Sequence, residues 1–93
     1  MKLVVEDGGA AAFFRALAPG PRKALRRALE QLRQDPSGKK HALDVKALEG
    51  DHGKGLYRLR VGRQRVIFGV TGNVIRVTRI IDRSSGYDWL RDE

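Results

Sequence analysis

Arginine is concentrated in one stretch of this sequence, where its spacing favours phosphate chemistry. Between Lys54 and Arg83 there are eight basic residues, seven of them arginine, and one acidic residue, Asp82. A guanidinium offers planar, bidentate hydrogen bonds that match phosphate oxygens, which an ammonium cannot copy. Solubility is usually obtained with mixed lysine and glutamate. The arginine bias therefore favours recognition of a polyanion such as nucleic acid, with a merely solvated surface as the alternative.

The most informative passage is a predicted β-hairpin that turns at Gly62-Arg63. Glycine supplies the positive φ that a two-residue hairpin turn needs. The expected cross-strand pairs are Val61 with Gln64, Arg60 with Arg65, Leu59 with Val66, and Tyr57 with Phe68. This register gathers four apolar side chains on one face: Tyr57, Leu59, Val66 and Phe68. It gathers three arginines on the other: Arg58, Arg60 and Arg65.

Like charges directly opposite one another destabilise a sheet, so this arrangement favours a pre-formed anion site. The alternative is that the arginine stems cover the sheet while their heads stay in water.

The other chemistry-bearing residues form no convincing site. His41 and His52 are predicted surface residues, because neither has a partner at metal-ligand spacing. The acidic residues are scattered, which does not support a two-metal carboxylate site, and cysteine is absent. The glycine-rich segment 50–55 lacks the strand–loop–helix setting of a nucleotide-binding loop. We therefore expect no metal and no small-molecule cofactor.

The totals are those of one small basic domain. The chain has 93 residues and a net charge of +8, with 41% apolar residues. That apolar share suffices for one modest core. The N-terminal apolar run is too short for a signal peptide, and no stretch approaches the ~20 apolar residues of a membrane span. We expect a cytoplasmic protein with no membrane association.

The elements that must position the arginines can be placed by periodicity. Apolar spacing of two predicts strands at 2–6, 56–61, 65–71 and 74–81. Spacing of three to four predicts helices at 9–18 and 21–34, which a short Pro-Gly-Pro turn should join as an antiparallel hairpin. Segment 39–54 is predicted to be mostly loop, with one short alternating piece at 43–48.

A last short helix should begin at Ser84-Ser85, with Asp88 completing a motif similar to a capping box. The order β-α-α-β-β-β-α predicts a single α+β domain over 1–93. In it the N-terminal strand and a helical hairpin pack on a small antiparallel sheet. In the strand at 74–81, apolar and charged residues occur on both of the alternating faces. The sequence therefore does not decide whether the strand has a β-bulge near its end.

Several of these segments together resemble the RelE/ParE superfamily of bacterial toxins. The resemblance runs through Leu48-Glu49-Gly50, Tyr57 to Gly62, Arg65 to Phe68 and Val74 to Ile80, and ends at Arg83 and Tyr87. It implies the toxin of a type II toxin–antitoxin pair. RelE-like members are ribosome-dependent mRNA endonucleases held inactive by a cognate antitoxin. The implied partners are therefore an antitoxin protein and mRNA on the ribosome.

The resemblance also implies a set of site residues. The implied catalytic residues are Arg65, Arg83 and Tyr87. The implied RNA- and phosphate-binding residues are Arg58 and Arg60, and we add Arg63 in the hairpin turn as a further candidate for binding RNA phosphate. In such a site the RNA 2′-OH attacks the adjacent phosphorus, arginines stabilise the added charge, and Tyr87 takes part in proton transfer. The alternative for Tyr87 is an ordinary packing aromatic beside Trp89 and Leu90.

One departure from the family pattern keeps other functions open. Many relatives have Gly-His before the last arginine, where this chain has Ile81-Asp82. Asp82 could substitute as a base or form a local ion pair. The alternatives are a ParE-like protein that inhibits DNA gyrase without catalysis, and a degenerate member that only binds its antitoxin.

Overall fold

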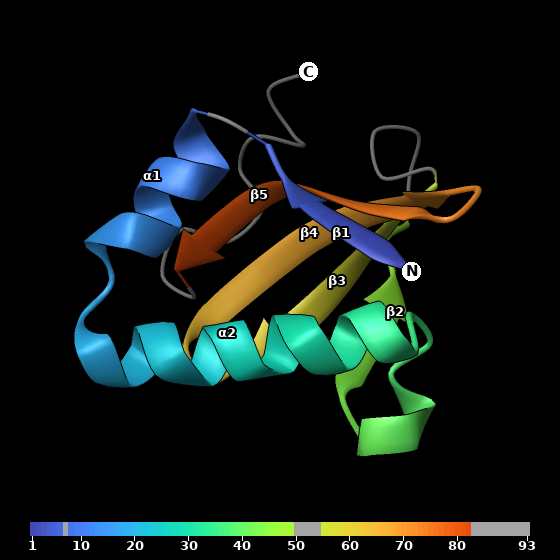
Figure 1. Ribbon diagram of the computed structural model, residues 1–93, viewed down its shortest axis with the longest axis horizontal. Helices are drawn as coiled ribbons and strands as arrows, with labels where there is room; N and C mark the ends of the chain where they lie inside the picture. The colour runs from blue at the N-terminus through green and yellow to red at the C-terminus, as the bar shows by residue number, and fades with distance from the viewer. Residues whose placement is uncertain (7, 50–54, 83–93) are drawn as a thin grey trace.

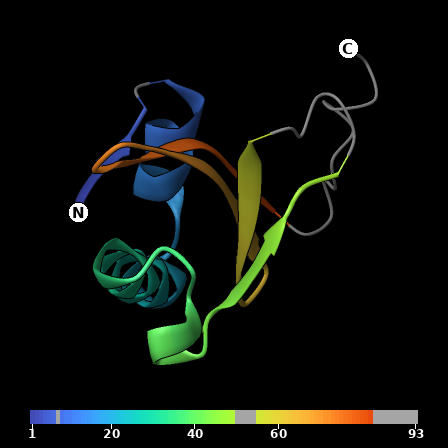
Figure 2. The same cartoon turned by 90° about the vertical axis from the view of Figure 1, so that its right-hand side faces the viewer.

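The computed structural model describes residues 1–6, 8–49 and 55–82 as two helices packed on one face of a five-stranded sheet (Figures 1 and 2). The predicted C-terminal helix lies outside these residues, as do Arg83 and Tyr87. The helices and strands, in chain order, are β1 (Lys2–Val5), α1 (Gly9–Ala16), α2 (Pro19–Gln34), the 3-10 helix η1 (Lys39–His41), β2 (Asp44–Ala47), β3 (Leu56–Val61), β4 (Gln64–Thr71) and β5 (Val74–Asp82).

The sheet is mixed, with strand order β1-β5-β4-β3-β2. All neighbouring strands are antiparallel except β1, which pairs parallel to β5 and places Leu3 opposite Ile75. The parallel pair and the strand β2 are differences from the expected sheet. β2 is the alternating piece at 43–48, which becomes a strand because it pairs with β3 from Asp44↔Arg60 to Ala47↔Tyr57.

The two helices cover the apolar face of the sheet without lying antiparallel to each other. Figure 1 shows α1 running across the direction of α2. The cause is the connection, since Leu17 and Ala18 are both extended (ψ 146° and 155°) and redirect the chain before Pro19 opens α2. Proline is tolerated there because the first turn of a helix needs no backbone donor.

The core lies between α2 and the sheet. Its α2 side consists of Leu25, Ala28, Leu29 and Leu32, one stripe at helical spacing. Its sheet side consists of Leu59, Val66, Phe68, Ile75, Val77 and Ile80, and all ten residues are buried. Ala10 adds the contact of α1. Because the apolar strand residues of this core point toward the helices, most charged side chains of strands β2 to β5 lie on the other face, together with Ile67 and Ile81.

The β3–β4 hairpin has the expected register. Gly62 (φ 55°) and Arg63 form the turn, and Arg60↔Arg65, Leu59↔Val66 and Tyr57↔Phe68 are paired. Tyr57 stacks on Phe68 with ring centroids 5.6 Å apart. This register fixes which side chains reach each face.

The start of β2 is fixed by a second glycine. Gly38 adopts φ 79°, and a Cβ there would lie 2.7 Å from Cγ2 of Val45. Asp35 organises the same loop by accepting hydrogen bonds from the backbone N–H groups of Ser37 (3.1 Å) and Lys40 (2.9 Å). The bond from the Lys40 N–H is the main reason that the pKa of Asp35 lies below its ordinary value.

Candidate nucleic-acid interface

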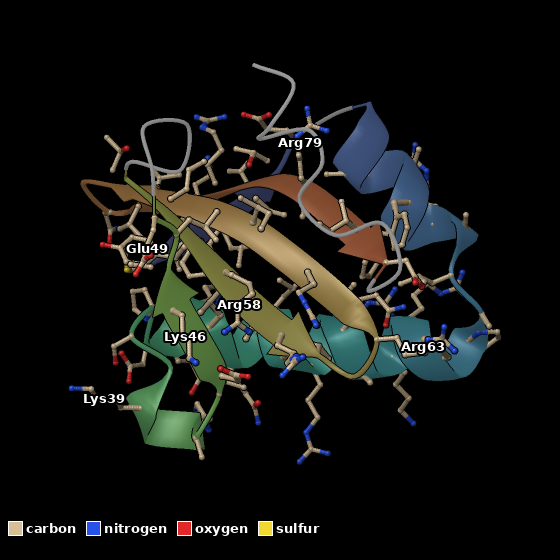
Figure 3. The ribbon with its side chains drawn as sticks, turned by 180° about the vertical axis from the view of Figure 1, so that it is seen from behind. Lys39, Lys46, Glu49, Arg58, Arg63 and Arg79 are labelled. Carbon is tan, nitrogen blue, oxygen red and sulfur yellow. The ribbon has the colours of Figure 1, made fainter. Side chains whose placement is uncertain are left out.

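The sheet face opposite the helices carries two rows of side chains across strands β2 to β5. Antiparallel partners point to the same side of a sheet, so the register gives these rows directly. One row is Asp44, Arg60, Arg65 and Ile81, and the other is Lys46, Arg58, Ile67 and Arg79. We call these eight residues the arginine face. Figure 3 views the molecule from this side, with Lys46, Arg58 and Arg79 labelled.

A β-bulge in β5 adds Arg79 to this face. Ile67 pairs with Arg79 and Phe68 pairs with Val77, so Thr78 is an extra residue without a partner in the ladder. The hydroxyl of Thr78 donates a hydrogen bond to the Ile67 carbonyl at 3.3 Å. A bulge reverses the parity of a strand. Val77 and Ile80 can therefore both be buried in the core while Arg79 points to the other side.

Two arginines of the arginine face each have one guanidinium nitrogen that is buried without a hydrogen-bond partner among the described residues. Among the residues that the structure describes, Nη1 of Arg58 and Nη1 of Arg65 have no hydrogen-bond partner. The Arg58 side chain is only 12% exposed. A buried, unpaired donor costs about 1–3 kcal/mol, and more when it is charged. An anion accepting from both groups would remove that cost.

Asp44 is the only acidic residue on the arginine face. Its carboxylate lies 3.4 Å from Nη2 of Arg58 and 4.0 Å from Nη1 of Arg60. The hydrogen bond from Arg58 is the main reason that the pKa of Asp44 lies below its ordinary value. Asp44 therefore orients both arginines from the edge strand, and its carboxylate forms no ion pair with Arg65.

We predict that Asp44→Asn removes a pH-dependent contribution to stability. Because the folded-state pKa is lowered, the contribution is complete above the unfolded-state pKa of about 3.9 and is lost as the pH falls through the folded-state pKa. Asp44 is 43% exposed, so solvent screening keeps the effect below about 1 kcal/mol.

Thermal unfolding of both proteins from pH 7 to pH 2.5 checks this prediction. The wild type should melt a few degrees higher at pH 7, and the difference should vanish at the acid end. A difference that does not change with pH would show that Asp44 acts through packing.

A known toxin is similar in sequence to most of this chain. The toxin RelE3 of Methanocaldococcus jannaschii is 34% identical over 69 residues, which cover 74% of this chain and 76% of that protein. The chain belongs to the RelE toxin family. No family model matches it.

Solved structures share the fold of this RelE-family chain. The RelB–RelE antitoxin–toxin complex from Methanococcus jannaschii has a TM-score of 0.72 and 26% identity, covering 92% of this chain and 96% of that one. The archaeal RelE–RelB complex from Pyrococcus horikoshii has the same TM-score at 23% identity, covering 88% and 93%. A copper-bound mutant toxin from Helicobacter pylori has a TM-score of 0.62 at 15% identity, covering 91% and 97%.

The structure of this RelE-family chain brings together three of the predicted site residues. Arg58, Arg60 and Arg65 share the arginine face, whereas Arg63 is exposed in the β3–β4 turn (Figure 3). Arg83 and Tyr87 lie outside the described residues. Asp82 pairs in register with Gln64, whose neighbour Arg65 is on the arginine face. Its register position is therefore on the helix side of the sheet, which disfavours Asp82 as a base among the arginines.

The described residues offer little for other kinds of site. His41 is the last residue of η1, and its Nε2 lies 3.2 Å from Oε1 of Gln34. His52 lies outside the described residues. Within the described ranges, no group of three His, Asp or Glu residues could hold a metal ion. None of the described helices is long and apolar enough to cross a membrane.

Proposed function

We propose that this chain is the toxin of a type II toxin–antitoxin pair and that it cleaves mRNA on the ribosome. Membership in the RelE family supports the assignment of this chain as a toxin. The observation that carries the cleavage is the pair of buried guanidinium atoms of Arg58 and Arg65, which have unused donors on one face. Those donors suit a phosphate that gains negative charge during reaction.

The reaction needs no metal in this proposal. The RNA 2′-oxygen forms a bond to the adjacent phosphorus while the bond from phosphorus to the 5′-oxygen breaks. The 2′-hydroxyl proton leaves, the 5′-oxygen gains a proton, and the products are a 2′,3′-cyclic phosphate and a 5′-hydroxyl. Arginines cannot act as bases, because a guanidinium stays protonated at neutral pH. We assign proton transfer to Tyr87.

The arginines have a different task in the same step. Arg65 and Arg83 are proposed to stabilise the pentavalent phosphorus, and Arg58 and Arg60 to clamp the same scissile phosphate. Arg63 is proposed to bind a further phosphate of the RNA. Charge stabilisation by donors that are already in place avoids reorganisation during the reaction. The structural support is that Asp44 already orients Arg58 and Arg60.

An antitoxin partner completes the proposal. Two of the solved relatives are complexes of a RelE with a RelB antitoxin. We propose a cognate antitoxin for this chain, with acidic side chains where it meets the arginine face. Opposite charges would give such a complex fast association and specificity.

In vitro translation with purified protein tests the proposed cleavage. Mapping of mRNA 5′ ends by primer extension should show discrete cuts within translated codons, and omission of ribosomes should remove them. Intact mRNA together with blocked supercoiling in a parallel gyrase reaction would replace this proposal with the ParE-like function. No effect in either reaction would leave only the degenerate antitoxin-binding member.

A further inference from the structure

A hollow opens on the same side of the sheet as the arginine face. Its volume is about 400 Å³, and its lining includes Leu56, Gly69, Thr71, Val74, Arg76 and Thr78. In the register, Gly69 pairs with both Leu56 and Arg76 and lies two residues beyond Ile67 on β4. Two strand residues span about 6.6 Å. The hollow therefore begins directly beside Arg58 and Arg79, which pair with Ile67.

The hollow exists because residue 69 has no side chain. Gly69 is not among the glycines with positive φ, so its backbone conformation does not require glycine. A Cβ at this position would meet nothing closer than 3.6 Å, the distance to the Gly55 carbonyl oxygen and to Cδ2 of Leu56. Glycine weakens the middle of a strand and often marks a place where a ligand approaches the backbone. Backbone conformation therefore does not explain a glycine at position 69, and the feature that distinguishes Gly69 is the open space beside it.

The lining combines apolar walls with polar groups at the rim. Leu56 and Val74 provide apolar surface, and Arg76 is exposed on the same side. Thr78 donates its hydroxyl proton to Ile67, which leaves the lone pairs of that oxygen as acceptors. A nucleobase has the complementary form, with two apolar faces and an edge of donors and acceptors. Unpaired bases bind proteins by stacking on side chains, including arginine planes, and by hydrogen bonds along their edges.

We propose that this hollow holds one unpaired nucleobase of the RNA whose phosphate lies on the arginine face. The inference rests on the proposed mRNA cleavage and names a base-binding subsite for it. The base would fix the position of its nucleotide along the strands, and through it the position of the neighbouring phosphate beside Arg58 and Arg65. Gly69 would act by leaving space and would touch no reacting atom.

The test uses ribosomes stalled on a synthetic mRNA with an empty A-site codon. One base of that codon at a time is replaced by an abasic ribose, and the cleavage rate is measured with full-length wild type, Gly69→Ala and Gly69→Val. Removal of one particular base should slow the wild type about tenfold, a typical loss for one bound base. Gly69→Val should cut the intact codon about tenfold more slowly, and removal of the same base should slow it no further. Gly69→Ala should lie between the two.

Controls separate the hollow from the fold and from the proposed cleavage. Val61→Ile adds one methylene at the turn end of the β3–β4 hairpin, on the helix side of the sheet and outside the lining of the hollow, and should cut like the wild type. Thermal unfolding shows whether each variant is folded, and Gly69→Ala still tests the proposal if Gly69→Val is not. If no single base matters to the wild type, or if Gly69→Val remains sensitive to the same base, the hollow binds no base. If the wild type cuts no codon at all, the proposed cleavage itself is wrong.

Discussion

Replacement of Arg65 by methionine is expected to slow mRNA cleavage by 100- to 1000-fold and to raise the stability of the folded protein. Loss of one pre-positioned donor to a developing oxyanion typically costs about that factor in rate. Nη1 of Arg65 is buried without a hydrogen-bond partner among the described residues, and Arg65 lies directly opposite Arg60. Removal of the charge should therefore stabilise the fold by about 1 kcal/mol, while methionine keeps the apolar stem.

Opposite signs for activity and stability distinguish a functional arginine from a structural one. The measurements are the rate of codon cleavage in the translation reaction and the free energy of unfolding in urea. Arg27→Met is the matched control, because it removes the same charge from an exposed position on α2. It should change the cleavage rate only slightly and the stability by less than about 0.5 kcal/mol. Arg65→Met with unchanged cleavage would contradict the assignment, and a large loss of stability would make Arg65 a structural residue.

Arg58→Met should slow cleavage to a similar extent but stabilise less. It also removes the ion pair with Asp44, which offsets part of the gain. The difference between the two variants in free energy of unfolding measures how much the Asp44 carboxylate contributes to stability, apart from the cost of the unpaired arginine donors. Natural proteins commonly accept such a stability cost where function needs it.

The hairpin could be predicted from sequence because its signals are local. Gly62-Arg63 sets the turn, and the period of two then leaves one register in which Leu59, Val66 and Phe68 are all buried. β2 was harder to predict, because a four-residue strand with Asp44 and Lys46 carries little apolar signal. It is a strand only because it pairs with β3. The parallel pairing of β1 with β5 joins segments about seventy residues apart, and no local pattern encodes it.

The site shows the same limit. Arg58, Arg60 and Arg65 were placed together correctly because they belong to one hairpin. Arg79 joins them only through the bulge at Thr78, and the sequence of β5 was compatible with either parity. Asp44 was missed with its strand, although the alternation at 43–48 was the signal that could have found it. The hollow at Gly69 is lined by residues of three strands, β3, β4 and β5, so no single sequence motif predicts it.

Replacement of Phe68 by alanine is expected to destabilise the protein by about 3–5 kcal/mol, the usual cost of removing a buried phenylalanine. Its side chain is fully buried in the core between α2 and the sheet. It also supports Tyr57, whose ring stacks on it at 5.6 Å. The free energy of unfolding of a small domain is about 5–15 kcal/mol in total. The melting temperature should therefore fall by about 20 °C.

Two further variants show whether the loss comes from the cavity. Phe68→Leu should cost less than Phe68→Ala, because leucine fills most of the space. Val70→Ala, two residues on and 37% exposed, should cost less than about 1 kcal/mol. A fall of under 5 °C for Phe68→Ala would mean that the core tolerates the loss by collapsing around it.

The same variant connects the core to the arginine face. Phe68 and Ile67 are consecutive residues on opposite sides of β4, so the packing of Phe68 fixes the register that places Arg58 opposite Ile67. Phe68→Ala should therefore cleave poorly at 37 °C, where it is partly unfolded, and recover most of its activity at about 15 °C. Arg65→Met should stay inactive at both temperatures, because it lacks the donor and not the fold. Phe68→Ala that is folded but inactive at 15 °C would mean that the packing of the core also tunes the geometry of the arginines directly.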